Sequence, residues 1–162
     1  MRGGVLCIAA VAVLLLPACG GSGGGGSTQQ QQLSAAAYRA KIAKIRGEAA
    51  DAQTRVAEGL QAKTVGELKQ RVDEFAATTQ RIGDEVAALT PPANAVPANT
   101  ELAQGLHDIA AATRAASAKI ATMKTVQEAV SSLRQSHGPV KGSHEVVNAL
   151  LELKKLGYTT GS

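Results

Sequence analysis

The stretch that decides the fold is AKTVGELKQRVDEFAATTQRIGDEVAALTPP, residues 62–92. Thr64 and Glu67 have the spacing of a capping box, so we expect a helix to begin here. Inward-facing residues then recur in alternating steps of four and three, as on one face of a helix. Pro91 and Pro92 lack a backbone donor and end the helix. The inward positions are Leu68, Val72, Phe75, Thr79, Ile82, Val86 and Leu89, and we expect Phe75 to be the largest core side chain.

The residues before this stretch have the same period. Ser34 can cap a helix, and Leu33 can pack against Tyr38 as a hydrophobic staple. This first helix should pair with the next one as an antiparallel hairpin. Its expected inward positions are Tyr38, Ile42, Ile45, Ala49, Ala52, Val56 and Leu60.

A third helix is expected to open at Asn99 or Thr100. The helical phase breaks near Lys124, where Thr125 and Glu128 have the spacing of a second capping box, so a fourth helix should start at about Val126. The alternative is a third helix that continues through residue 136. The inward positions of the third helix are Leu102, Leu106, Ile109, Thr113, Ala116, Ile120 and Met123.

The sequence KTVGE at residues 63–67 is echoed by KTVQE at 124–128, each between a long helix and a returning one. This repeat indicates two related αα-hairpins. SHGP at 136–139 interrupts the second return arm, and Ser143 is expected to cap a last helix that ends at Leu156 before a left-handed Gly157. The sequence therefore predicts an all-α fold, an antiparallel helical bundle of two αα-hairpins with a broken fourth arm.

Small or hydroxyl-bearing residues occupy the middle of three inward faces, and in an antiparallel bundle they meet at one level. The helices either approach closely there or leave a small cavity with two hydroxyls. Close approach is favoured because protein interiors avoid voids. These mid-face residues are Ala49, Ala52, Thr79, Thr113 and Ala116.

The first 18 residues have the pattern of an export signal. Arg2 and the free amine precede an apolar run at 5–16, and twelve helical residues rise only about 18 Å, too little to span a bilayer. The run ends in Leu16-Pro17-Ala18-Cys19. This resembles the lipobox of bacterial lipoproteins, which implies cleavage before Cys19 and a diacylglyceryl group on its thiol. Two acyl chains on one residue make anchoring stable.

The chain divides into three parts: a lipoprotein signal peptide at 1–18, the lipidated cysteine and a Gly/Ser/Gln tether at 19–32, and a helical bundle domain at 33–158. The tether cannot bury apolar area, and thirteen flexible residues reach about 20 Å. The formal net charge is +4, and removal of Arg2 with the leader would leave +3. Cys7 would also leave, so the mature chain could form no internal disulfide.

These features together resemble those of short uncharacterised actinobacterial lipoproteins, which have a lipobox, a Gly-rich tether, a Leu-Ser…Tyr helix start and a Leu-x-x-Pro-Pro break. The resemblance covers roughly the first 90 residues, and many such chains have a cysteine where this one has Arg46. It implies a location and a helical fold, and no activity. The residues that carry it are Leu16 to Cys19, Leu33, Ser34, Tyr38 and Leu89-Thr90-Pro91-Pro92.

Candidate catalytic and metal sites are weak. In the helical domain at 33–158, no Gly-x-Ser-x-Gly, His-Glu-x-x-His or P-loop occurs, and the Gly-x-Ser-x-Gly match at 20–24 is part of the glycine tract. These motifs indicate catalysis only where a fold positions the nucleophile, the metal ligands or the phosphate. His137 and His144 flank a loop but lack a third ligand at a suitable spacing, and His107 is expected to be solvated. There is no basic run with aromatic partners for a nucleic acid. We therefore expect no catalytic residue, no metal, no cofactor and no nucleic-acid partner.

The sequence predicts a non-enzymatic helical module, lipid-anchored on the extracytoplasmic face of the cell membrane, that binds an envelope protein or wall polymer. Residues 144–156 are apolar over more than one helix face. The apolar side chains that do not face the bundle must be buried elsewhere or left exposed for a partner. The candidate interaction face is Leu150, Leu151 and Leu153. The alternative is a four-helix bundle that binds or senses a small ligand in the mid-face space.

Overall fold

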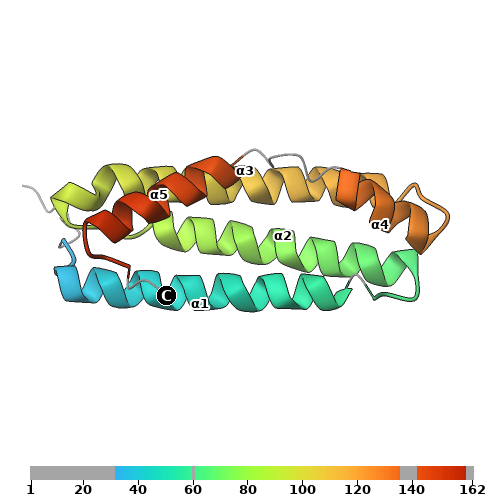
Figure 1. Ribbon diagram of the computed structural model, residues 1–162, viewed down its shortest axis with the longest axis horizontal. Helices are drawn as coiled ribbons and strands as arrows, with labels where there is room; N and C mark the ends of the chain where they lie inside the picture. Colours follow the sequence, from blue (N-terminus) through green and yellow to red (C-terminus); the bar gives the residue numbers. More distant parts are fainter. Residues whose placement is uncertain (1–31, 60, 136–141, 160–162) are drawn as a thin grey trace, which may run out of the picture.

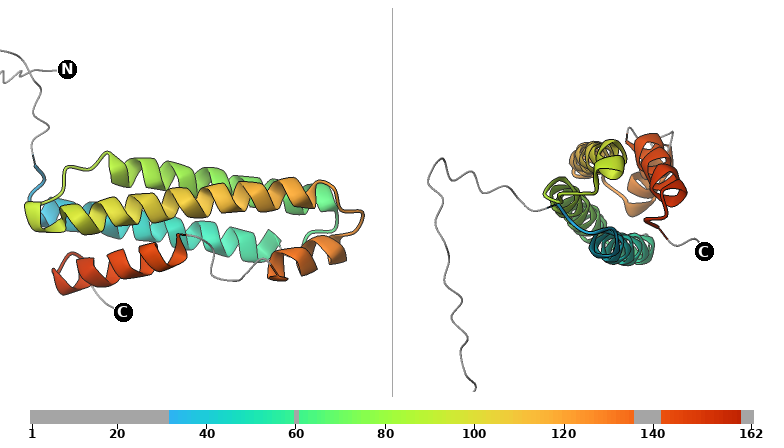
Figure 2. Two further views of the ribbon diagram at one scale, coloured as in Figure 1. Left: turned by 90° about the horizontal axis from the view of Figure 1, so that it is seen from above. Right: turned by 90° about the vertical axis from the view of Figure 1, so that its left-hand side faces the viewer.

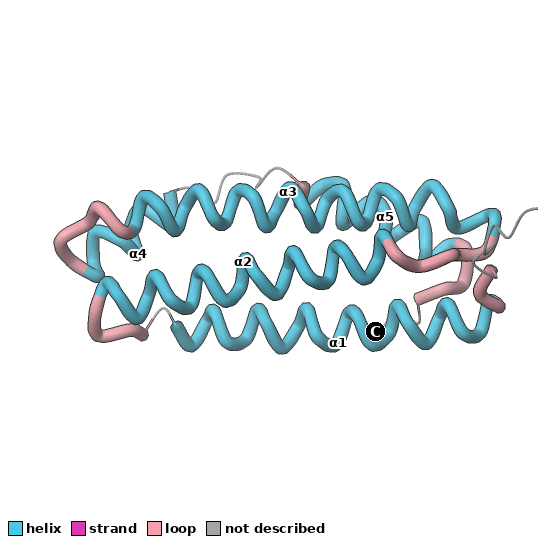
Figure 3. The backbone as a smooth tube through the Cα atoms, turned by 180° about the vertical axis from the view of Figure 1, so that it is seen from behind, coloured by secondary structure: helices cyan, strands magenta, loops and turns pink. Residues whose placement is uncertain are grey.

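The computed structural model describes residues 32–59, 61–135 and 142–159. These residues form helices and loops, with no strand in the described ranges (Figures 1 and 3). The predicted all-α class is confirmed. In chain order, the elements are α1 (Ala35–Gly59), α2 (Val65–Ala87), the 3₁₀ turn η1 (Ala93–Ala95), α3 (Val96–Ile120), α4 (Val126–Gln135) and α5 (Ser143–Lys155).

The three long helices run antiparallel, and the two short ones return along α3 at its opposite ends, as Figure 2 shows. α2 lies between α1 and α3, α5 packs against α3, and α4 contacts both α2 and α3. The bundle of two αα-hairpins with a broken fourth arm is therefore confirmed. A continuous third helix is wrong, because α3 ends at Ile120 and α4 begins only at Val126.

Both predicted turn motifs make the threonine cap hydrogen bond, and the first is a complete capping box. Thr64 Oγ1 accepts from the Glu67 amide at 3.1 Å, and the Glu67 carboxylate accepts from the Thr64 amide at 3.3 Å. In the second turn, Thr125 Oγ1 accepts from the Glu128 amide at 3.2 Å, while the Glu128 carboxylate accepts from the Lys124 amide at 3.2 Å. The sequence echo thus corresponds to a repeated structure, and both turns lie at the same end of the bundle (Figure 1).

The core consists of two clusters. The larger one joins α1, α2, α3 and α5 at the end where α1 begins, and the smaller one joins α2, α3 and α4 at the end with the two capping boxes. The broken arm therefore covers each end with a separate short helix. The larger cluster contains Tyr38, Ile42, Ile45, Ile82, Val86, Ala95, Ala98, Leu102, Ala103, Leu106, Ala149, Leu153 and Tyr158; the smaller contains Leu68, Val72, Ile120, Ala129 and Leu133.

The start of α3 differs from the prediction. The helix begins at Val96, three residues before Asn99, because Pro97 fits the first turn, where its missing N–H costs nothing. Asn99 is instead a buried tertiary contact: it accepts a hydrogen bond from the Tyr38 hydroxyl at 3.0 Å and donates one to the Val86 carbonyl at 2.9 Å. Its side chain is therefore not available to cap the helix.

Phe75 was expected in the core and is only half-buried. The neighbouring position Ala76 is buried instead, because the buried face of α2 is turned toward α3. Gly83 allows this approach: a Cβ at Gly83 would lie 2.5 Å from His107 Cδ2 on α3. Small residues thus set the α2–α3 contact, and the large aromatic ring is left between α1 and α2.

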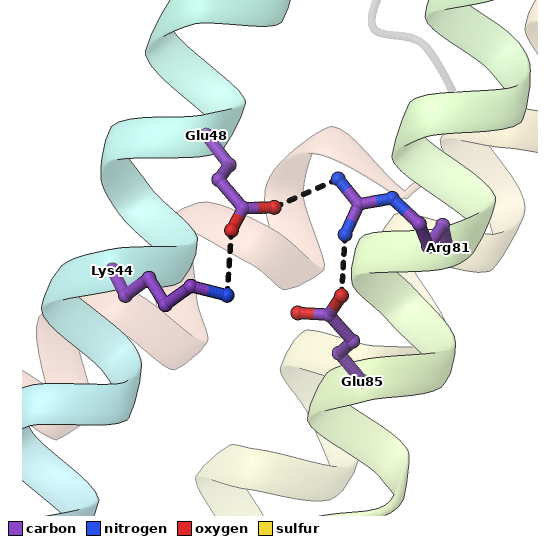
Figure 4. Close-up of polar contacts among 4 residues, drawn as sticks. All are labelled: Lys44, Glu48, Arg81 and Glu85. Atoms are coloured by element: carbon purple, nitrogen blue, oxygen red, sulfur yellow. Dashed lines mark hydrogen bonds and ion pairs between the residues drawn. The ribbon is translucent and has the colours of Figure 1, made fainter.

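An exposed ionic network ties α1 to α2 (Figure 4). Glu48 accepts from Lys44 Nζ at 2.9 Å within α1 and from Arg81 at 2.7 Å across the two helices, and Arg81 also pairs with Glu85. The hydrogen bonds from Lys44 and then Arg81 lower the pKa of the Glu48 carboxyl. The network adds a polar link between α1 and α2 to the contacts that already join these two helices.

Candidate functional site

Helix α5 is held at its N-terminus by direct backbone contact with α3. A Cβ at Gly142 would lie 2.3 Å from the Gly105 carbonyl oxygen, and one at Gly105 would lie 2.8 Å from the Gly142 carbonyl oxygen. Gly142 has φ +99° and is the N-cap, in place of the predicted Ser143, which lies inside the helix. Only glycine combines this left-handed conformation with so close an approach.

The C-terminus of α5 is fixed by the predicted glycine stop. Gly157 has φ +77°, its amide donates to the Lys154 carbonyl at 2.9 Å, and the Tyr158 amide donates to the Leu153 carbonyl at 2.8 Å. These two bonds form a Schellman motif. The motif turns the Tyr158 ring back into the core against α1.

The ring of Tyr158 meets Tyr38 edge-on, with centroids 5.1 Å apart. Tyr38 is fully buried. Burial, and to a smaller extent the electrostatic effect of the Tyr158 hydroxyl, raises the pKa of Tyr38 to about 12. The Tyr38 hydroxyl therefore stays protonated at neutral pH and donates to Asn99. This cluster joins the last described residues of the chain to the first helix.

The predicted interaction face is divided between core and surface. Leu153 is fully buried and Leu150 packs half-buried against the core, whereas Leu151 is 52% exposed. Val147, one helical turn earlier, is 54% exposed. We call Val147 and Leu151 the outer pair of α5. Val147 was missed because α5 is apolar on several faces, although its four-residue spacing from Leu151 is a usable signal.

The lipid site lies outside the described residues. Cys19 and the lipobox residues Leu16, Pro17 and Ala18 all belong to the segment before residue 32. Within the described ranges, no helix combines the length and the apolar character required to cross a membrane.

Two of the three histidines lie within the described residues. His107 Nε2 lies 3.0 Å from Asp84 Oδ1 across α2 and α3, His144 is exposed at the start of α5, and His137 lies outside the described residues. Among the residues that the structure describes, no three side chains of metal-ligating type form a group.

The mid-face residues are packed to different degrees. Ala52 and Thr79 are buried, while Ala49, Thr113 and Ala116 are half-buried. A recess of about 20 Å³ beside Phe75 touches Ala52, which is room for roughly one water. A larger surface pocket of about 320 Å³ lies elsewhere, at the α1–α2 turn. That pocket is lined by Glu58, Gln61, Ala62, Lys63, Glu67, Gln70 and Arg71.

Comparison with protein-family models, curated proteins and solved structures found no match to this chain.

Proposed function

We propose that this chain is a membrane-anchored extracytoplasmic lipoprotein that acts as a non-enzymatic helical interaction module in the cell envelope. The observation that carries the proposal is the outer pair of α5. Val147 and Leu151 are about half exposed on a helix whose opposite side, through Ala149 and Leu153, is fully buried. A helix that only covers a bundle needs one apolar stripe, so the second stripe is best explained by a partner.

The outer pair favours a protein partner over a wall polymer. Two branched aliphatic side chains one turn apart fit an apolar groove or the face of another helix. Sugar polymers present hydroxyl and charged groups, which would leave Val147 and Leu151 in contact with water. The polar side chains exposed around the pair, Asn148 and Glu152, suit the rim of such an interface.

The anchor half of the proposal rests on the Leu16-Pro17-Ala18-Cys19 sequence and the apolar run before it. It is tested by growing cells that express the full chain with an alkyne fatty acid. We expect the wild-type chain to be labelled and Cys19→Ser to be unlabelled. Equal labelling of both chains would exclude Cys19 as the acylated residue.

The interaction half is tested with a photoreactive residue placed at Leu151 in the full lipidated chain in intact cells. The matched control is the same residue at Ala111, which is exposed on α3. We expect one discrete crosslinked protein from position 151 and none from 111. Identical adduct patterns from both positions would mean random collision, and the outer pair would then be an ordinary surface.

Leu151→Glu complements the crosslinking test. We expect it to abolish partner capture and to leave the helical circular dichroism signal almost unchanged, because the side chain is 52% exposed. If Leu151→Glu unfolds the domain, Leu151 is part of the core and the proposed face does not exist.

A further inference from the structure

One end of the bundle gathers the start of the domain and its last described residues. The Leu33 amide donates to the Thr90 carbonyl at 2.8 Å, which holds the start of the described chain on the α2–α3 turn. The Tyr158 hydroxyl donates to Asn94 at 2.9 Å, so the end of α5 meets the same turn. We call this the Gln32 end, comprising residues 32–39, 88–97 and 154–158; it lies opposite the two capping boxes (Figures 1 and 2).

The Gln32 end has exposed apolar side chains. Val96 is 46% exposed and Leu156 is 38% exposed. Both lie at this end of the bundle, each two residues along the chain from a partner in the Tyr158–Asn94 hydrogen bond. The other exposed large hydrophobic residues in the described ranges are the outer pair of α5. The capping-box end has none among its described residues.

Cationic side chains surround Leu156. Lys154 and Lys155 are exposed in the last turn of α5, and Arg39 donates to the Gly157 carbonyl at 2.9 Å. The nearest acid on α5 is Glu152, which pairs with Lys155 at 3.2 Å. Apolar side chains ringed by Lys and Arg are the composition that suits the interface of an anionic bilayer.

We infer that the Gln32 end is a lipid-contacting surface, which seats the bundle end-on against anionic phospholipid headgroups. The inference rests on the proposed anchor at Cys19. A flexible linker of thirteen residues, the number between Cys19 and Leu33, spans about 20 Å, whereas the 25 residues of α1 rise about 37 Å. The anchor therefore holds the Gln32 end at high local concentration near the lipid, where weak contacts are sufficient.

End-on seating gives the rest of the bundle a direction. The two capping-box turns and α4 point away from the membrane, and the outer pair of α5 faces sideways, clear of the lipid. Val96 and Leu156 reach the interface, and Lys154 and Lys155 meet lipid phosphates. The orientation thus leaves the proposed partner face accessible.

The test measures which end of the bundle is close to lipid. The full acylated chain is incorporated into vesicles of phosphatidylglycerol and phosphatidylcholine, with a fluorophore on Leu156→Cys or, as the matched control, on Gln127→Cys at the start of α4. Nitroxide on lipid headgroups quenches only nearby fluorophores. We expect strong quenching at position 156 and little at 127. Equal quenching at both positions would mean that the bundle lies flat, and no quenching at 156 would mean that this end is free of lipid; either result overturns the inference.

Vesicle flotation separates this inference from the proposed anchor. If the wild-type chain fails to float with the vesicles, the anchor is wrong and end-on seating fails with it. If the chain floats and position 156 is unquenched, only end-on seating fails.

A pair of double variants tests the contribution of charge. Lys154→Gln with Lys155→Gln should lower the quenching at 156 without changing flotation, whereas Lys119→Gln with Lys124→Gln, with the same change in net charge, should leave it unaltered. Equal effects of the two double variants would show a response to net charge alone and would contradict a specific cationic surface.

Discussion

The two hairpins begin their return in the same way and continue differently. In both, the turn follows a 25-residue helix, and a threonine hydroxyl accepts a hydrogen bond from the amide of a glutamate three residues later. The first hairpin then returns through α2, an unbroken helix of 23 residues. The second returns through α4 and α5, with 10 and 13 residues.

The difference shows that the turn motif determines where the chain reverses. It does not determine how long the returning helix is. α2 lies between α1 and α3 and is buried from both sides, whereas α5 packs chiefly on α3. Helices of 10 to 13 residues are marginal alone and depend on tertiary packing. Compared with α2, α5 therefore has one main neighbour instead of two.

The largest expected effect separates the two faces of α5. Leu153→Ala should cost about 2–5 kcal/mol, since Leu153 is fully buried. Leu151→Ala, two residues away and 52% exposed, should change stability by less than about 0.5 kcal/mol in the absence of a partner. Chemical denaturation of the two variants measures this directly. Similar costs for both would mean that α5 is buried on both sides, as α2 is between α1 and α3.

The second prediction tests how deeply Phe75 is buried compared with Ile82 on the same helix. Ile82→Ala should cost about 2–5 kcal/mol, because Ile82 is almost fully buried. Phe75→Ala should cost only about 1–2 kcal/mol, because the ring is half-buried beside a surface recess. Urea unfolding midpoints rank the two. A larger loss from Phe75→Ala would mean that the Phe75 ring lies in the core, as the sequence period alone suggests.

The third prediction compares the two capping boxes. Loss of an N-cap costs roughly 0.5–2 kcal/mol. Thr64→Ala should lower the melting temperature of the whole domain, because α2 contacts both α1 and α3. Thr125→Ala should mainly increase local hydrogen exchange in the short α4. If Thr125→Ala lowers the melting temperature as much as Thr64→Ala, then α4 is as integral to the bundle as α2.

The smallest expected effect is a pH dependence located in the long helices. The pKa of Glu48 is lowered by hydrogen bonds from Lys44 and Arg81, and that of Asp73 chiefly by Lys69 at 2.6 Å. The ordinary values are 4.5 and 3.8, so this stabilisation is present at neutral pH and is lost as the pH falls through the lowered values. The loss should be small, because both carboxylates remain partly accessible to solvent, which screens their ion pairs.

Urea unfolding between pH 7 and pH 3 measures the pH dependence. Glu48→Gln should flatten part of it, and an unchanged pH profile in that variant would exclude the α1–α2 network as a source.

Local signals in the sequence predict the ends of the elements well. Ser34 caps α1, with its Oγ accepting from the Ala37 amide at 3.2 Å, and Gly157 forms the predicted left-handed stop of α5. Such signals succeed because all their hydrogen bonds lie within a few residues. The start of α5 was misplaced by one residue, because Gly142 is selected by its contact with Gly105, far away in the sequence.

The direction of each buried face was harder to predict, because it depends on which helix lies alongside. On α3 the sequence period placed Ile109, Thr113 and Ala116 inside, yet these are half-buried, and Ala103, Ala110 and Ser117 are buried instead. Small residues are favoured where two helices approach closely. A search for the period of large apolar residues gives alanine and serine too little weight. The same effect divides the candidate face on α5, where Ala149 and Leu153 are buried and Val147 is left exposed.

The central claim is that α5 is attached to the bundle by one face and opens separately from it. Residue-level hydrogen exchange of the full chain, free of its partner, tests this most directly. We predict that the amides in the middle of α5, around Ala149, exchange well before those around Val72 to Ile82 in α2, because sub-global opening of α5 needs only its contacts with α3 and the Tyr158 cluster to break. Exchange of both groups at one common rate would mean that α5 opens only when the whole domain unfolds, and would contradict the claim.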